Sequence, residues 1–508
     1  MLSKVTSYAL VGLEGVPVEV ETDINKGMVS FELVGLPDTA VKESKERVSS
    51  AIRNSLLRFP VNKITVNLAP ADIKKEGGQY DLPIAVSILS ASGQLTADTQ
   101  DTVMLGELAL DGALRAVTGI LPVLISAKAK GFKRFVVPFG NANEASYIEG
   151  IEVYALKSLR ETFEFLSGGD FKPVEIRSFE AVQRSARYNS DMGLVRGQSV
   201  AKRALEIAVA GGHNLLLSGP PGAGKTMLAR CIPTIMPDMT FEEALEVTKI
   251  LSVSGELGEE GIATLRPFRT PHHTASTVSL CGGGNTRIRA GEISKAHRGV
   301  LFMDELPEYS RSALEALRQP LEDGKITVTR AGGAVTFPAD FILCASMNPC
   351  PCGNYGSKER QCTCTPAQIR RYRAKISGPL LDRIDLQVEV DNVKYDELAG
   401  GGEGEKSSEV KRRVELARAI QRERFRGEDG VNVNADMGEK QIREFCRLSP
   451  DCESILRAAF ERLHLSARAR SRIIKVARTI ADLDSSAEIS PKHILEATSY
   501  RNFDSSEK

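Results

Sequence analysis

Hydrophobic and polar positions alternate with different periods in successive parts of the chain. In the first part, short apolar runs typical of strands alternate with stretches whose apolar spacing is typical of helices. The strand-like runs lie at 17–21, 64–68 and 135–138, and the helical stretches lie at 42–55 and 82–92. This mixture predicts an α+β domain, which we assign to residues 1–166.

Three further segments follow this domain. A polar stretch with little apolar periodicity, including Gly168-Gly169-Asp170, predicts a linker at 167–191. Strands and helices then alternate over 192–393, as in an α/β nucleotide-binding core. Glycine and acidic residues crowd positions 397–408, a second candidate hinge, and helical patterns dominate the last domain, 394–508. These segments predict a multidomain α/β protein with three domains. This number agrees with a length of 508 residues, at roughly 100–200 residues per domain.

Composition and charge narrow the classes of protein that remain. Hydrophobic residues make up 42% and charged residues 26% of the chain, which excludes wholesale disorder, collagen-like repeats and a disulfide miniprotein. The 66 Lys and Arg balance 66 Asp and Glu, so the chain does not coat nucleic acid by overall positive charge. The net charge does not exclude a local basic channel. The longest apolar runs, such as 82–89, are shorter than the roughly 18 residues of a membrane-spanning helix, and the N-terminus lacks a signal-peptide pattern. We therefore expect a cytoplasmic protein without a membrane partner.

A glycine-rich loop supplies the first chemical motif. The apolar run 215–218 continues directly into Gly219, Pro220, Pro221, Gly222, Ala223, Gly224, Lys225 and Thr226, and a helical pattern follows. This string fits G-x-x-x-x-G-K-[ST] between a strand and a helix. The glycines let successive backbone N–H groups face phosphate oxygens, Lys225 is expected to reach the β- and γ-phosphates, and Thr226 to hold Mg²⁺. The alternative is a chance glycine-rich turn.

Polar residues end two further apolar runs. The run 299–303 ends in Asp304 and Glu305, and charged residues rarely end a buried strand without a partner. Asp304 is expected to hold Mg²⁺, directly or through water, and Glu305 to orient the attacking water as a base. The run 341–347 leads to Asn348, which is expected to contact the γ-phosphate or position water. The alternatives are an acidic helix cap at 304–305 and a simple turn at Asn348-Pro349.

Four of the nine cysteines form two short pairs, Cys350-Pro-Cys352 and Cys362-Thr-Cys364. Zn²⁺ takes four tetrahedral thiolates, although a C-x-C pair is less usual than C-x₂-C. The intervening loop is too small and polar to form a core of its own. The pattern therefore predicts a structural zinc site, and unmetallated or redox-active thiols are the alternative.

The order of these motifs resembles that of the AAA+ ATPases, specifically their magnesium-chelatase-like ComM/YifB branch. Specific strings at 31–44, 67–72, 269–273, 291–294, 348–353 and 475–483 extend the resemblance over nearly the whole chain. It implies a cytoplasmic hexameric ATPase that uses ATP and Mg²⁺ to move along DNA, as a helicase or branch-migration translocase in recombination during natural transformation. It also implies a Lon-protease-like N-terminal domain, an AAA+ P-loop core and a C-terminal helical lid.

The resemblance assigns roles to further nucleotide-site residues. Val195 and Arg196 fall in the adenine-side box, Arg383 resembles an arginine finger, and Arg468 resembles a sensor-2 arginine turned toward nucleotide. Each guanidinium would offer a fixed fork of donors to triphosphate oxygens, and an Arg383 acting from a neighbouring subunit would make activity depend on assembly. A surface ion pair is the alternative for either arginine. The histidine pair 272–273 is expected to hydrogen-bond within the core or near the nucleotide.

Three arginines are candidate DNA contacts. Residues 325–337 form two β-like runs around a glycine turn, which predicts a hairpin. Related helicases carry a basic residue on such a hairpin in the central pore, which favours Arg330, and a second glycine-rich insert carries Arg287 and Arg289. We expect sequence-independent, salt-dependent binding of single-stranded or branched DNA. Solvated loop tips are the alternative, and most basic residues of the stretch 462–478 are expected on a solvated helix face.

The resemblance to Lon proteases stops at their catalytic residues. Where those proteases carry a nucleophilic serine in a Lys-Asp-Gly-Pro-Ser run, this chain reads Lys75-Glu-Gly-Gly-Gln79, and 118–122 contains no lysine to complete a dyad. We therefore expect a binding or assembly module without peptidase activity. A chelatase-type ATPase that remodels a protein partner is the alternative function, although the chain lacks a metal-adhesion domain of the von Willebrand type.

Overall fold

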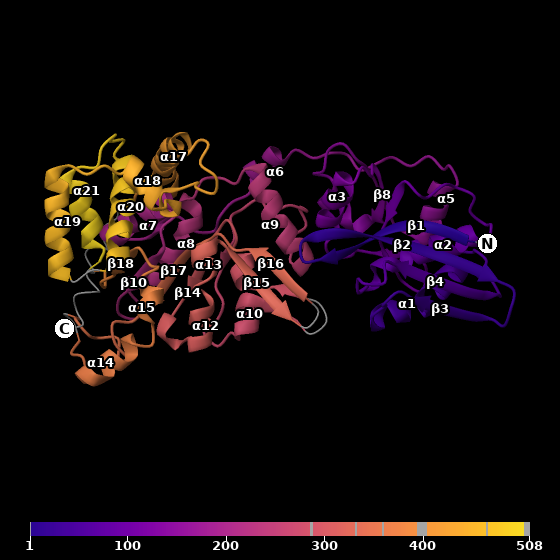
Figure 1. Cartoon of the computed structure of the whole chain (residues 1–508), viewed down its shortest axis with the longest axis horizontal. Helices are drawn as coiled ribbons and strands as arrows, with labels where there is room; N and C mark the ends of the chain where they lie inside the picture. Colours follow the sequence, from indigo (N-terminus) through magenta and orange to yellow (C-terminus); the bar gives the residue numbers. More distant parts are fainter. Residues whose placement is uncertain are drawn as a thin grey trace.

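The computed structural model describes residues 2–284, 288–330, 333–357, 360–393, 404–463 and 466–501. Arg287 lies outside the described residues, as does the side chain of Arg330. The molecule is elongated, with the N-terminal sheet at one end, a second α/β layer in the middle and the C-terminal helices at the other end (Figure 1). Among the helices of the described residues, none combines the length and apolar character that crossing a membrane requires.

The N-terminal part is built on a mixed sheet. Its seven strands lie in the order β3-β4-β2-β1-β5-β8-β9, with β2 antiparallel to both of its neighbours, β1 and β4, and the remaining pairs parallel. The strands are β1 (Leu2–Val11), β2 (Glu14–Asn25), β3 (Ser30–Val34), β4 (Lys63–Ala69), β5 (Thr102–Met104), β8 (Arg134–Pro138) and β9 (Glu152–Leu156). In β4 every second residue is buried, which is the pattern of a strand with one face in the core.

Helices and two short strands complete this part. The helices are α1 (Thr39–Asn54), α2 (Asp81–Ala91), α3 (Ile120–Ala129), α4 (Ala142–Ala145) and α5 (Leu159–Leu166), with 3₁₀ turns at Gly78–Tyr80 and Phe139–Asn141 and a small pair β6 (Glu107–Leu108) and β7 (Leu114–Arg115). Asp38 caps α1 by accepting from Val41 N at 2.8 Å. The predicted strands and helices of this segment are confirmed, each within a few residues of its expected bounds.

The central part is a parallel five-stranded sheet. Its order is β11 (Phe268–Arg269), β14 (Val300–Met303), β17 (Ile342–Met347), β10 (Leu215–Ser218) and β18 (Leu386–Glu389). Every residue of β10, β14 and β17 is buried, because helices cover both faces of the sheet and each strand is an unbroken, almost wholly apolar run. The predicted mixed α/β structure with a parallel sheet is thus confirmed, and it is consistent with a P-loop AAA+ core.

Helices and short connections surround this sheet. They are α7 (Ser199–Gly211), α8 (Lys225–Ile235), α9 (Phe241–Ser254), α10 (Thr277–Cys281), α11 (Glu292–Lys295), α12 (Arg311–Ala316), α13 (Pro320–Asp323), α14 (Pro366–Arg373) and α15 (Gly378–Leu381), with 3₁₀ turns at Met192–Leu194 and Leu306–Glu308. Two small ribbons extend from it, β12 (Gly282–Gly283) with β13 (Arg289–Ala290), and β15 (Lys325–Arg330) with β16 (Gly333–Pro338). The second ribbon is the predicted hairpin, with Arg330 paired opposite Gly333.

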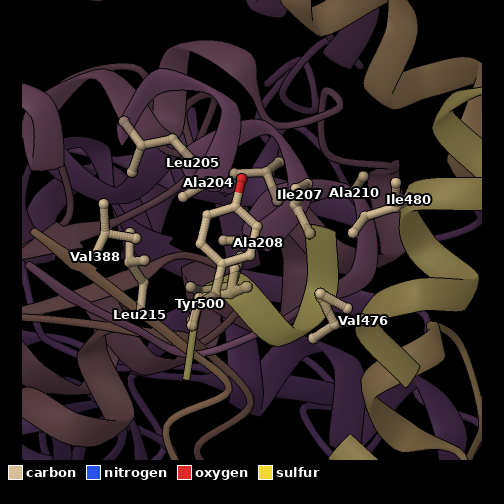
Figure 2. Packing of buried hydrophobic residues seen from close by; sticks show 14 of the residues in the cluster. Ala204, Leu205, Ile207, Ala208, Ala210, Leu215, Val388, Val476, Ile480 and Tyr500 are labelled. Atoms are coloured by element: carbon tan, nitrogen blue, oxygen red, sulfur yellow. The ribbon is translucent and has the colours of Figure 1, made fainter. Parts of the chain in front are cut away.

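The C-terminal helices share one apolar core with the central sheet. They are α17 (Ser407–Arg424), α18 (Glu439–Phe445), α19 (Pro450–Leu463), α20 (Ala467–Leu483) and α21 (Pro491–Ser499), with a 3₁₀ turn at Asn434–Asp436. Figure 2 shows the Tyr500 ring among side chains of α7, β10, β18 and α20, and all of these residues belong to one buried cluster. The helical character predicted for this part is confirmed in the described residues, while the domain boundaries stay predictions.

The basic residues of 462–478 divide into two groups. Arg462, Arg468 and Arg470 are exposed, as expected, whereas Arg472 and Lys475 are half-buried and Arg478 is buried. Arg478 is 2% exposed and pairs with Asp482, which also accepts from Arg424 Nη1 at 2.8 Å. Lys475 Nζ donates to a backbone carbonyl at 2.8 Å, and Arg472 pairs with a buried carboxylate. The sequence could not show this, because the acceptors of Arg472 and Lys475 come from other segments of the chain.

The N-terminal part and the linker that follows it contact the central part at several points. The predicted linker 167–191 contains α6 (Phe179–Ser185), whose Phe179 ring lies 5.7 Å from the ring of Phe241 in α9. The buried Glu144 accepts hydrogen bonds from the Ser252 hydroxyl of α9 and from Leu121 N. In addition, the turn between β1 and β2 packs on the hairpin β15–β16, since a Cβ at Gly12 would lie 2.6 Å from Val335 Cγ1 (Figure 1).

Candidate active site

The glycine-rich loop leaves the sheet at the carboxyl end of β10 and leads into α8. Gly222 and Gly224 have φ angles of +82° and +86°, which side chains rarely adopt, and a Cβ at either would meet no described atom within 4 Å. The loop therefore borders open space, with the helix N-terminus of α8 directly behind it. This arrangement fits a phosphate group, because backbone N–H groups and the helix dipole both favour an anion at such a position.

Lys225 lies between this loop and Asn348. Its Nζ donates to the Gly219 carbonyl at 2.6 Å, to the Pro220 carbonyl at 2.9 Å and to Asn348 Oδ1 at 3.2 Å. Burial lowers the pKa of Lys225, and the nearby carboxylates of Asp304 and Glu305 act in the opposite direction. The structure thus brings the predicted lysine and the predicted asparagine together at one edge of the sheet.

Thr226 and Asp304 also meet at this edge. The Thr226 hydroxyl donates to Asp304 Oδ2 at 3.3 Å, while Asp304 Oδ1 accepts from Glu305 N at 3.1 Å and from the Ser346 hydroxyl. A hydroxyl and a carboxylate are oxygen ligands of the kind that Mg²⁺ prefers, with phosphate and water completing its shell. Sequence reasoning missed Ser346, although a polar residue at the carboxyl end of the apolar strand β17 was the available signal.

Glu305 is held in an unusual conformation and faces a histidine. Its φ of +53° lies in the left-handed region, where a residue with a side chain is strained, and its side chain is half exposed. His273 Nδ1 lies 3.7 Å from Glu305 Oε2, and the His272 ring lies against the His273 ring at a tilt of 33°, with centres 4.1 Å apart. The histidine pair was expected within the core or near the nucleotide, and the structure places His273 beside Glu305, a contact that the sequence did not predict.

The segment predicted to contact adenine lies beside the phosphate loop. Val195 is buried, and one terminal nitrogen of Arg196, Nη1, is buried without a hydrogen-bond partner among the described residues. Gln198 Nε2 donates to the carbonyl of Ala223 at 3.3 Å and to that of Asp391 at 2.5 Å. Gln198 therefore ties this segment to the phosphate loop, and Arg196 has a buried donor whose acceptor is absent among the described residues. Gln198 was not predicted from the sequence as a residue of this site.

Arg383 and Arg468 lie at the opposite edge of the sheet. Asn214, which precedes β10, donates to the Arg383 carbonyl at 2.9 Å, and both arginines line a cavity of about 320 Å³ together with Asn214. Four residues of β10 separate Asn214 from the phosphate loop, about 13 Å at the usual rise per residue of a strand. Arg468 therefore does not turn toward the nucleotide site of its own chain, because α20 packs on α7 and begins at this other edge.

The Arg383 guanidinium is only partly satisfied. It pairs with Glu322, whose side chain is 62% exposed, and its Nη1 donates to the Pro379 carbonyl at 2.8 Å. Its Nε is buried without a hydrogen-bond partner among the described residues. The pair with Glu322 thus joins a buried guanidinium to an exposed carboxylate, and Nε remains a donor without an acceptor among the described residues.

The candidate DNA residues occupy the two ribbons. In β15–β16, Ile326, Val328 and Phe337 are buried, while the Thr327 and Thr336 hydroxyls meet at 2.9 Å on the other face. Arg330 ends β15 at the tip of the hairpin, and Arg289 is exposed in β13. A contact of these arginines or of Arg287 with DNA stays a prediction.

The four clustered cysteines converge on one point. Their sulfur atoms all lie within 4.8 Å of one another, and Cys350, Cys352 and Cys362 are separated by 3.4, 3.6 and 3.7 Å. Four thiolates around zinc at about 2.3 Å would lie about 3.8 Å apart. The donor set and its spacing therefore fit Zn²⁺.

A parallel sheet with a phosphate loop, paired carboxylates and a polar strand end at one edge defines a P-loop nucleotide-binding protein with an AAA+-type core. Three family models match successive parts of the chain: the magnesium chelatase subunit ChlI at residues 191–398, the subunit ChlI of Mg-chelatase at 20–141, and the C-terminal part of the magnesium chelatase subunit ChlI at 404–501.

Two relatives match the chain from end to end. The competence protein ComM of Haemophilus influenzae is 44% identical over 98% of this chain and 97% of its own length. The protein YifB of Escherichia coli, described as uncharacterized, is 45% identical over 99% of this chain and 97% of its own length. The chain therefore belongs to the magnesium-chelatase-like ComM/YifB family of AAA+ proteins, as its motifs predicted.

Proposed function

We propose that this protein is an ATP-hydrolysing ring-shaped motor that acts on DNA. The observation that carries the proposal is the placement of its polar groups: the phosphate loop, Asp304 and Asn348 gather at one edge of the central sheet, and two arginines gather at the other. The similarity to a competence protein supports a role in DNA recombination during natural transformation. We place the motor in the cytoplasm, where ATP and DNA are present and thiols stay reduced.

The residues at the loop edge divide the work of hydrolysis. Lys225 binds the β- and γ-phosphates, and Thr226 and Asp304 hold Mg²⁺, which neutralises charge that builds up on the phosphates. Glu305 takes a proton from the attacking water, and its strained backbone and His273 fix the position of the carboxylate. Asn348 contacts the γ-phosphate while its Oδ1 holds Lys225.

The position of Arg383 and Arg468, at the edge of the sheet opposite the phosphate loop, is the reason for proposing a ring. A head-to-tail assembly brings a different surface of each subunit against its neighbour, and the contact repeats until the ring closes. In such a ring Arg383 and Arg468 of one subunit complete the nucleotide site of the next, where their guanidinium groups stabilise charge that develops during hydrolysis. We propose a hexamer, following the family.

The DNA contact lies on the hairpin β15–β16. Arg330, with Arg289 and Arg287 on the second ribbon, would contact phosphates in the enclosed pore of the ring, so binding does not depend on base sequence. A chain with no net charge is compatible with this arrangement, because the positive groups gather only where subunits surround the DNA.

The terminal parts have supporting roles. We propose a Lon-protease-like fold without peptidase activity for the N-terminal part, as a binding or assembly module, and a lid function for the C-terminal helices. Lys75 Nζ donates to the Pro70 carbonyl and the buried Gln79 amide donates to the Tyr8 carbonyl at 3.0 Å, so both side chains make structural bonds. Turnover of casein by the purified protein would contradict this assignment.

ATP hydrolysis measured with and without DNA tests the proposal. DNA should stimulate turnover, Lys225→Ala should abolish ATP binding, and Glu305→Gln should retain binding but lose hydrolysis. Glu308→Gln is the matched control, because Glu308 lies in the same loop and pairs with Lys375 at the surface. Strand displacement on forked and four-way DNA, with and without ATP, then tests motor activity directly.

The family models favour one second candidate, a chelatase-type ATPase that remodels a protein partner. This candidate uses the same nucleotide site. It predicts ATP turnover that DNA does not change and no strand displacement, so the same two assays separate the candidates.

A further inference from the structure

The four-cysteine loop lies directly beside the nucleotide site. Cys350 follows Asn348 by two residues, and Asn348 Oδ1 holds Lys225 of the phosphate loop. On the other side, a Cβ at Gly353 would lie 2.6 Å from the Pro221 ring, so the backbone of the cysteine loop packs against the phosphate loop itself. The cysteine loop is therefore one wall of the ATP site.

The end of the cysteine loop returns to the same asparagine. Helix α14 begins two residues after Cys364, and it carries the buried Tyr372, whose hydroxyl lies near the backbone of Asn348. Arg373 of α14 donates to the Pro349 carbonyl at 3.4 Å, and its guanidinium lies 5.2 Å from the centre of the Tyr355 ring. The segment thus leaves the site at Asn348, passes through all four cysteines and closes again on Asn348.

The loop has little apolar packing of its own. Among the described residues 351–357 and 360–365, only Gly353 is buried, and helices and strands are absent from these same ranges. A polar loop of this size requires a cross-link to keep one conformation, since burial of apolar surface does not supply the free energy. Its sulfurs converge instead, and Cys350 Sγ also accepts from the backbone N–H of Tyr355 at 3.3 Å.

We propose that Zn²⁺ bound by Cys350, Cys352, Cys362 and Cys364 fixes the loop that positions Asn348 and Pro221, so that nucleotide binding depends on the metal. The proposal rests on the ATP site of the proposed function and not on any DNA activity. Zinc here is structural, because four protein ligands leave no position open for substrate. Zinc affects ATP binding only through the conformation of the loop. Without the cross-link, the cysteine loop no longer holds Asn348 and the phosphate loop in position, and the affinity for ATP falls.

The first test measures zinc and ATP binding in the same preparations. Full-length protein purified without added metal should contain about one zinc per chain by mass spectrometry. Cys352→Ser and Cys364→Ser should lose it, whereas Cys281→Ser, at a half-buried cysteine outside the cluster, should retain it. Affinity for a fluorescent ATP analogue should fall in the two cluster variants and in wild-type protein treated with a zinc chelator.

A pair of glycine variants tests the mechanical link with all four sulfurs in place. Gly353 and Gly356 have φ angles of +79° and +80°, so alanine strains the backbone equally at both positions. At Gly353 the new Cβ collides with Pro221, whereas at Gly356 it meets no described atom within 4 Å. Gly353→Ala should bind zinc but lose affinity for the analogue, and Gly356→Ala should retain both.

Each outcome decides the proposal. A zinc content far below one per chain, with the thiols reduced, overturns it. Zinc that is present but whose removal leaves analogue affinity unchanged also overturns it, as does equal behaviour of the two glycine variants. If the cysteine variants do not fold, the glycine variants and the chelator treatment of wild-type protein still test the proposal. Failure of the proposed function shows up separately, because then Lys225→Ala would not weaken binding of the analogue.

Discussion

Mixing two inactive variants tests whether Arg383 completes the site of a neighbouring subunit. Lys225→Ala removes the lysine of the phosphate loop, and Arg383→Ala removes a guanidinium at the opposite edge of the sheet. An arginine that stabilises phosphoryl transfer contributes about a thousandfold or more to turnover, so each variant alone should be nearly inactive. If the two edges meet between subunits, a mixed ring contains some sites in which neither lesion is present.

The recovery follows from this arrangement. In an equal and random mixture, half of the sites have an intact Lys225, and half of those face an intact Arg383. About one quarter of the wild-type ATP turnover should therefore return, whatever the number of subunits in a closed ring. If Arg383 served its own chain, every subunit would carry one lesion at its own site, and turnover would not return.

Steady-state ATP hydrolysis across a series of mixing ratios is the assay, with mixed assembly verified by co-purification of differently tagged chains. Lys225→Ala mixed with Glu305→Gln is the matched control, because both lesions lie at the loop edge and no intact site can form. Absence of recovery in verified mixed rings would refute the placement of Arg383 in a neighbouring site.

Three further outcomes are expected. Asp482→Asn should lower the free energy of unfolding by about 3–5 kcal/mol in urea titrations, because it leaves buried guanidinium groups unpaired. The control Asp484→Asn, at a half-exposed carboxylate, should lower it by less than about 1 kcal/mol. Equal effects of the two substitutions would contradict this prediction. Hydrogen bonds to a histidine and an arginine lower the pKa of Glu246 from 4.5 to about 2, so its stabilisation is present above pH 4.5 and is lost as the pH falls toward 2. Wild type and Glu246→Gln should converge over that range in urea unfolding, and a constant difference would contradict the assignment. Arg330→Ala should weaken binding to all DNA sequences alike and reduce its salt dependence, unlike the surface control Arg318→Ala, as measured by fluorescence anisotropy.

The phosphate loop could be predicted residue by residue because its chemistry is local. The strand, the glycine turn and the helix follow one another directly in the sequence. Asp304 and Asn348 could be predicted because each ends an apolar strand, and the carboxyl ends of parallel strands meet at one edge. The hairpin followed from its alternating pattern and its glycine turn.

The remaining features depend on contacts between distant segments. The position of Arg468 is set by the packing of α20 on α7, which no spacing within the segment 465–468 could show. His273 meets Glu305, and Ser346 meets Asp304, across neighbouring strands. The importance of Gly353 could not be predicted from the sequence, because it depends on the close approach of Pro221 from the phosphate loop.

The contact between Gly12 and Val335 has a mechanical consequence. The β1–β2 turn rests on the hairpin that carries Arg330, and β1 and β2 are strands of 10 and 12 residues in the N-terminal sheet. Leu13 of the same turn packs into the apolar cluster beneath the hairpin. The hairpin is therefore supported at two points, at its base in the central part and along its side by the N-terminal sheet. A force on the hairpin is transmitted to both parts of the molecule.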